Sequence, residues 1–204
     1  MRNRSISITA LSLLALPAAA AIQSATPGTL VHSPTGLIAG NAFGGQHAHA
    51  WNERQQVGVT NLAVDLVGAG NSGSPAPGLI TGVVDSHLLH AEAGWPLTPN
   101  QHTGTVAFNA PIVGVIWTAA GLNASDALLR PTGTTYSTSS QRGMASFPLE
   151  WVVVSGNTIQ FQLNRGPVFP SDYAQVRVLT AVPGPAAGVV LGAAGLVLGK
   201  RRRV

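Results

Sequence analysis

Apolar and polar residues alternate along several short stretches in the middle of the chain. Ile159, Phe161 and Leu163 alternate with Gln160 and Gln162. Because successive side chains of a strand point to opposite faces, this period of two predicts a strand with one buried face. The same reasoning predicts strands at residues 36–43, 56–66, 78–89, 104–109, 112–119, 147–154, 158–163 and 173–180.

Turn-forming residues separate these predicted strands. Ser155, Gly156 and Asn157 join two of them as a hairpin turn would. The segments 68–78 and 131–143 are rich in Gly, Pro, Ser and Thr and are predicted to be exposed loops. No amphipathic helix is predicted, so the pattern favours an all-β fold, an antiparallel β-sandwich or jelly roll.

The two ends of the chain differ from this middle part. Arg2 and Arg4 precede an apolar run at residues 6–16, followed by Pro17 and four alanines. This order is typical of a secretory signal peptide, with cleavage expected after Ala20 or Ala21. We therefore expect a signal peptide at 1–21 and export of the rest.

The C-terminal end predicts a single transmembrane helix. The motif Val182-Pro183-Gly184-Pro185 is followed by an apolar run at 186–199 and then by Lys200, Arg201, Arg202 and Arg203. Fourteen helical residues span roughly 21 Å, which is short of a hydrocarbon core of roughly 30 Å. The cationic cluster would stop transfer and stay on the cytoplasmic side, so the body at 22–181 would face outward.

This tail at 182–204 resembles the PEP-CTERM sorting signals of bacteria, which combine a short proline motif, one membrane helix and a terminal arginine cluster. Pro183 and Pro185 match the two prolines of that motif, and Gly184 stands where the family has glutamate. The resemblance implies recognition by an exosortase, a membrane-embedded cysteine protease or transpeptidase. It also implies a protein of the cell surface or of the extracellular polysaccharide.

Once both ends are set aside, the body contains five arginines against seven acidic residues and no lysine. The basic balance of the whole chain therefore belongs to its ends, and nothing predicts a nucleic-acid partner. The chain has no cysteine, which excludes disulfides and thiolate metal sites. About 160 residues suit one exported domain with a core of its own.

The body also resembles a domain that often accompanies such tails in bacteria. Its short motifs are Trp51-Asn52-Glu53-x-Gln55, Val84-Asp85-Ser86-His87, Gly104-x-Val106-x-Phe108, Pro111-Ile112-x-Gly114-Val115-Ile116, Ser125-Asp126, and Asp172 with Arg177-Val178-Leu179-Thr180. This resemblance implies a β-rich exported domain and brings no known activity.

Histidines are the strongest candidates for chemistry. His47 and His49 are two positions apart, so on a strand both rings would project from one face. His87 is a third candidate ligand, with Glu53, Asp85 and His90 available nearby in sequence, a set that would suit zinc, iron or copper. This set defines the alternative function, a metal-dependent extracellular enzyme.

Other candidate sites involve the acidic residues of the body. Asp85, Ser86 and His87 are the residue types of a hydrolase triad, but consecutive strand residues alternate faces and cannot converge. Glu53 and Glu150 could form a glycosidase pair, and Glu53 with Asp85 could bind calcium. Hydrogen bonds from these carboxylates to loop backbone are the simpler expectation.

Four tryptophans bear on ligand binding: Trp51, Trp95, Trp117 and Trp151. They are expected to serve mainly in packing, although an exposed Trp51 or Trp95 could stack on a sugar ring. The sequence thus predicts an exported structural or ligand-binding protein without enzymatic activity or cofactor, whose possible ligand is carbohydrate.

Overall fold

The computed structural model describes residues 19–26, 28–33, 36–38, 42–43, 47–92, 100–144, 149–165 and 173–182. The fold is all-β with one helix, which confirms the predicted class. A five-stranded antiparallel sheet has the order β1 (Ile22–Ala25), β9 (Asn100–Phe108), β13 (Thr158–Arg165), β12 (Trp151–Ser155) and β7 (Gly70–Asn71).

The second sheet has seven strands. Six of them follow the order β2 (Thr29–Val31), β4 (Ala48–Asn52), β8 (Gly78–Glu92), β14 (Tyr173–Ala181), β10 (Ile112–Ile116) and β6 (Leu66–Val67), and β5 (Val57–Val64) pairs with the first half of β8. The β2–β4 pair is parallel and the other pairs are antiparallel. A small parallel pair joins β3 (Leu37–Ile38) to β11 (Thr135–Tyr136).

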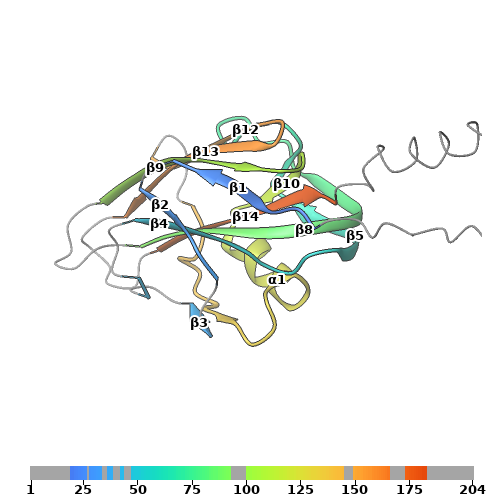
Figure 1. The fold of residues 1–204 in the computed structure, drawn as a ribbon, viewed down its shortest axis with the longest axis horizontal. Helices are drawn as coiled ribbons and strands as arrows, with labels where there is room; N and C mark the ends of the chain where they lie inside the picture. The colour runs from blue at the N-terminus through green and yellow to red at the C-terminus, as the bar shows by residue number, and fades with distance from the viewer. Residues whose placement is uncertain are drawn as a thin grey trace, which may run out of the picture. The chain divides into compact units, whose positions relative to one another are not determined.

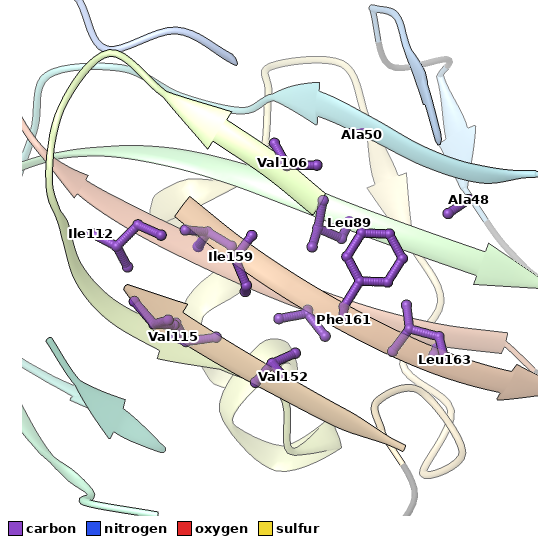
Figure 2. Close-up of a cluster of buried hydrophobic side chains, with 14 of the residues drawn as sticks. Ala48, Ala50, Leu89, Val106, Ile112, Val115, Val152, Ile159, Phe161 and Leu163 are labelled. Atoms are coloured by element: carbon purple, nitrogen blue, oxygen red, sulfur yellow. The ribbon is translucent and has the colours of Figure 1, made fainter. Parts of the chain in front are cut away.

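One apolar core lies between the two large sheets. Phe161 and Ile159 of β13 and Val152 of β12 come from the five-stranded sheet, while Leu89 of β8 and Val115 of β10 come from the seven-stranded sheet (Figure 2). Burial of such side chains is the main force that holds two sheets face to face.

The outer face of the seven-stranded sheet is also covered. The helix α1 (Ala119–Leu129) and the β3–β11 pair lie on the side of β8 and β14 opposite β9, β13 and β12 (Figure 1). A second apolar cluster includes Leu88 and Leu179 of the sheet with Leu122 and Leu129 of α1. The central strands β8 and β14 are therefore buried on both faces over most of their length.

The strongest alternations in the sequence match the structure. The hairpin at 155–157 is confirmed, because Ser155 pairs with Thr158 and Gly156 has a φ of 60°. The predicted strands at 56–66, 78–89, 104–109, 158–163 and 173–180 each overlap an observed strand. The predicted strand at 36–43 is represented by β3, and residues 39–41 lie outside the described part of the chain.

Three expectations were wrong. The helix α1 was not predicted, because its buried face contains Ser125 and Asp126 together with Leu122 and Leu129 and so lacks an apolar stripe. The segment 68–78 was predicted to be a plain loop, yet β7 lies within it and pairs with β12. No strand was predicted before residue 36, but β1 and β2 lie there, one in each large sheet.

Candidate functional site

The three histidines predicted as metal ligands do not converge. His87 of β8 packs on Phe108 of β9 with ring centroids 4.6 Å apart, so it points between the sheets. His49 stacks on Phe43 at 4.2 Å and points to the other face, since its neighbours on β4 fill the inter-sheet core. His47 directly precedes β4. Within the described ranges, no group of three or more His, Asp and Glu is placed to hold one metal ion. The structure therefore does not bring His47, His49 and His87 together.

His87 is instead a satisfied core residue. Its Nδ1 donates to the Asn52 side-chain oxygen at 2.8 Å, and the Thr180 hydroxyl donates to its Nε2 at 3.0 Å. Burial lowers the pKa of His87 to about 3. Its imidazole is therefore neutral at physiological pH and is engaged at both nitrogens.

His49 lies in a cluster of aromatic rings. The His32 ring meets the His49 ring edge to face, with centroids 5.2 Å apart, and Trp51 and His90 also contact the cluster through Phe43. Neither ring nitrogen of His49 has a hydrogen-bond partner in the described part of the chain. Burial, followed by the neighbouring imidazoles of His32 and His90, lowers the pKa of His49 to about 4. The ring therefore packs as a neutral aromatic group.

Glu53 lies at the centre of a buried polar network beneath α1. Arg177 of β14 donates to its two oxygens at 2.6 and 2.8 Å. The hydroxyls of Ser86 and Tyr136 donate to it at 2.6 and 2.7 Å. Trp51 in turn donates its indole N–H to the Tyr136 oxygen at 3.1 Å. The carboxylate of Glu53 thus has four donors, and no lone pair is left for a substrate.

The network continues along the sheet through one residue of α1, one of β14 and one outside the helix and strands. Asp126 of α1 accepts from Arg177 at 2.9 Å and from Nη2 of Arg142 at 2.9 Å. Arg142 also donates to the side-chain oxygen of Gln175, and Gln175 donates to Nδ1 of His90 at 3.1 Å. Asp126, Arg142 and Gln175 thus carry the network from Arg177 to His90.

His90 links this network to Glu92 through a hydrogen bond of 3.1 Å from Nε2. Glu92 also accepts from the backbone N–H groups of Ala42 and Phe43. Burial alone would raise the pKa of Glu92, but His90 and the two backbone donors outweigh it and the pKa is lowered. The network therefore ends on a charged, fully bonded carboxylate.

Arg177 and Tyr136 are both fixed in one protonation state. Burial acts to lower the pKa of Arg177, but Glu53 and Asp126 outweigh it and the pKa is raised. Burial and the Glu53 charge raise the pKa of Tyr136. Both groups are therefore protonated across the physiological range, as suits a structural network and not a catalytic acid and base.

The structure also bears on the other roles predicted for the carboxylates. Glu150 accepts from the backbone N–H of Asn164 in the five-stranded sheet at 2.8 Å, whereas Glu53 directly follows β4 of the other sheet, so the two form no glycosidase pair. Asp85 accepts from the backbone N–H groups of Gln56 and Ala20, which confirms the expectation of backbone hydrogen bonds for this residue. Ser86 and His87 point to opposite faces, as the alternation of a strand predicts.

The outer face of the five-stranded sheet has a different character. Trp151 of β12 stands beside Gln162 of β13, and Gln162 stands beside Thr103 of β9. In the next row, Gln160 pairs with both Val153 and Thr105. These rows contain amide, hydroxyl, aliphatic and indole groups and no charge.

Trp151 lies between two hollows on this face. One has a volume of about 460 Å³ and is lined by Thr103, Thr105, Trp151 and Gln160 among others. The other, of about 370 Å³, is lined by Trp151, Val153, Gln160 and Asn71 among others. No hydrogen bond in the described part of the chain uses the side chains of Gln160 and Thr103. We call this surface, made of Trp151, Val153, Gln160, Gln162, Thr103 and Thr105, the amide face.

The sequence pointed to other tryptophans. Trp51 is fully buried and donates to Tyr136, so it cannot stack on a ligand. Trp95 lies outside the described residues, and Trp117 packs partly buried against the inter-sheet core. The alternation around Trp151 could have identified it, because Val152 and Val154 face inward and so Trp151 and Val153 face outward.

The predicted signal peptide and the predicted sorting signal lie almost wholly outside the described ranges. Of the sorting motif, Val182 is described, whereas Pro183, Gly184, Pro185 and the membrane stop Lys200, Arg201, Arg202 and Arg203 are not. Residues 1–18 are likewise outside. Among the helices of the described segments, none has the length and apolar character needed to cross a bilayer.

Comparison with known proteins returned no match to a family model, to a curated protein or to a solved structure.

Proposed function

We propose that this chain is an exported protein of the bacterial cell surface, whose β domain binds carbohydrate. In this proposal, residues 1–21 direct export and residues 182–204 hold the precursor in the membrane for an exosortase-like protease. The β domain between them is a β-sandwich that is retained with extracellular polysaccharide. The PEP-CTERM resemblance supports the proposed export and sorting, and the amide face supports the proposed binding of carbohydrate.

The amide face is the observation that carries the ligand assignment. A neutral sugar offers hydroxyl groups and one apolar ring face. Gln160 and Thr103 supply free amide and hydroxyl groups, and the indole of Trp151 supplies a flat apolar surface. Because the amide face carries no charged side chain, a neutral ligand can bind there without removing water from a charged group, which would be costly. The two hollows beside Trp151 fall within the size range of small-molecule sites.

A second surface supports attachment to a membrane. An apolar hollow of about 430 Å³ is lined by Val67, Leu79, Val83, Val113 and Ala181 among others, with no charged residue in its lining. Leu79 and Val83 are 63% and 54% exposed. Ala181 is the last residue of β14, five positions before the apolar run of the tail, a reach of at most about 17 Å. A tail inserted in a bilayer would therefore hold this hollow close to the lipid.

Affinity electrophoresis tests the proposed ligand. The purified chain is run through gels containing a neutral glucan, a galactan or the polysaccharide extracted from the native host. We expect at least one of these polymers to retard the chain, and Trp151→Ala to remove most of the retardation. Leu79→Ala removes an exposed apolar side chain from the other sheet and serves as the matched control. Equal retardation of both variants, or none by any polymer, would refute carbohydrate binding at the amide face.

A further inference from the structure

The two hollows of the amide face adjoin each other. Trp151 and Gln160 line both of them. The lining of one hollow reaches Thr26, and the lining of the other reaches Asn71. We call the two adjoining hollows, from Thr26 to Asn71, the amide groove.

The amide groove crosses the full width of the five-stranded sheet. Thr26 directly follows β1, which is one edge strand, and Asn71 belongs to β7, which is the other. Thr26 is held against β9, because its backbone N–H donates to the Thr105 carbonyl at 3.0 Å and its hydroxyl oxygen accepts from the Thr105 N–H at 2.9 Å. Four spacings between neighbouring strands separate the two ends of the groove, a length of about 19 Å.

Along the strands the groove is much shorter. Its lining uses three consecutive positions of β9 (103–105), three of β12 (151–153) and two of β13 (160 and 161). Three strand positions extend over roughly 7 Å. The groove is therefore longer across the strands than along them, which suits a linear ligand that crosses the sheet.

We propose that the amide groove binds an internal stretch of a neutral polysaccharide that crosses the five strands. This inference rests on the carbohydrate binding proposed above and adds the length and direction of the ligand. An extended hexose chain advances by about one strand spacing per residue, so the groove takes about four sugar residues. Thr26 and Asn71 are both exposed, so a longer polymer can continue past either edge.

Polar groups are available at both ends of the groove as well as beside Trp151. The Asn71 side-chain oxygen accepts from the Ser74 N–H at 3.0 Å, and no hydrogen bond in the described part of the chain uses its amide N–H groups. The Thr26 hydroxyl accepts from Thr105, and within the described ranges no hydrogen bond takes its hydrogen. Each sugar residue added toward an end therefore gains a partner, and affinity should rise with chain length until the groove is full.

The dependence of affinity on chain length tests the proposed length. Oligosaccharides of one to six residues are made by partial hydrolysis of whichever polymer retards the chain in affinity electrophoresis, and each is titrated into the purified chain by calorimetry. We expect the dissociation constant to fall by about tenfold or more between two and four residues, and by less than about twofold between five and six. Equal affinity for two and four residues would overturn the inference.

Two variants test the direction of the bound chain. Asn71 lies at one end of the groove, whereas Gln101 is exposed on β9, two positions before Thr103, and lines neither hollow. A chain that crosses the strands passes Asn71, and a chain that runs along β9 passes Gln101. We expect Asn71→Ala to weaken binding of the six-residue oligosaccharide by about threefold to tenfold, and Gln101→Ala to change it by less than about twofold.

A second substitution at Asn71 controls for a disturbed turn. Asn71→Asp keeps the oxygen that accepts from Ser74 and loses the amide donors, so it should weaken binding about as much as Asn71→Ala. Undiminished binding in the Asn71 variants would overturn the inference, and a loss in Gln101→Ala alone would show that the chain runs along the strands.

The two proposals can fail separately. If no polymer retards the chain, or if Trp151→Ala is retarded like the wild type, carbohydrate binding at the amide face is refuted and this inference with it. If retardation depends on Trp151 but affinity depends neither on chain length nor on Asn71, this inference alone is refuted.

Discussion

Arg177 and Glu53 lie 124 positions apart in the chain and form two hydrogen bonds within the buried layer beneath α1. Both side chains are 0% exposed. Through this pair, the last strand of the domain is bonded to the residue that follows β4, and Asp126 adds the helix to the same guanidinium. The position of α1 on the sheet therefore depends on charge pairing as well as on apolar packing.

Replacing Arg177 should be strongly destabilising. Arg177→Met leaves the carboxylates of Glu53 and Asp126 buried with one partner fewer, so we expect a loss of about 3–5 kcal/mol in the free energy of unfolding measured in urea. Arg54→Met is the matched control, because Arg54 donates from the surface to the Leu128 carbonyl, and it should cost less than about 1 kcal/mol. Similar losses of unfolding free energy in the two variants would contradict a stabilising role for the buried network.

Acid should destabilise the fold through His87. Its folded-state pKa of about 3 lies below the ordinary value of 6.5, so the unfolded chain binds the proton first. The stability it contributes is complete above pH 6.5 and is lost as the pH falls toward 3. His87→Gln removes this titration, so its slope of unfolding free energy between pH 5 and 6 should be smaller by about 1.4 kcal/mol per pH unit. An unchanged slope would show that His87 is accessible to protons in the folded state.

Gly143 should not tolerate a side chain. Its φ is 133°, and an added Cβ would lie 2.5 Å from the Trp117 carbonyl oxygen and 3.0 Å from the Ala119 nitrogen. Gly143→Ala should therefore cost about 1–3 kcal/mol, measured by urea denaturation. Gly58→Ala meets open space on β5 and is the control, with an expected effect below about 0.5 kcal/mol. A harmless Gly143→Ala would mean that the start of α1 can shift.

The hollow beside Ala181 should face lipid in the anchored chain. Because the chain has no cysteine, Val83→Cys and Val153→Cys each accept one environment-sensitive dye. Val83 lines the hollow, and Val153 lies on the amide face of the other sheet. With the tail-bearing chain in phosphatidylethanolamine and phosphatidylglycerol vesicles, the dye at 83 should report an apolar environment and the dye at 153 should not. Equal signals from the two dyes would show that the hollow does not lie at the membrane. An apolar environment of the dye at 83 in the absence of vesicles would show that the apolar tail of the chain, and not lipid, covers the hollow.

The all-β class followed from the sequence because the alternating strands each bury at least one apolar face. The strand β14 shows the limit of that reasoning. Its alternation of Ala174, Val176 and Val178 with Gln175 and Arg177 is the pattern of a half-exposed strand, yet both faces are buried. The polar face packs against α1 and the network, a partner that local pattern cannot reveal. The helix was missed for the same reason, since Asp126 on its buried face pairs with Arg177.

The short motifs of the body have a structural explanation. Trp51, Glu53, Ser86, Asp126 and Arg177 all fall in motifs that carried its resemblance to other exported domains, and all belong to the buried network. Of these residues, the sequence suggested Glu53 as an acid or ligand, Ser86 as part of a triad and Trp51 as a sugar-stacking ring. Their spacing in the sequence gave no indication that they would pair with one another. The amide face contains none of these motif residues and was overlooked, because amides and hydroxyls give no distinctive motif.

The most direct test of the whole account is the intact mass of the protein recovered from its native host, measured separately in the membrane and the medium. The account predicts a species outside the cell that lacks the signal peptide and everything beyond about Val182. It also predicts a membrane-bound precursor that retains Lys200 to Val204. A single cytoplasmic species with the full mass of 20.8 kDa would contradict export, anchoring and sorting together.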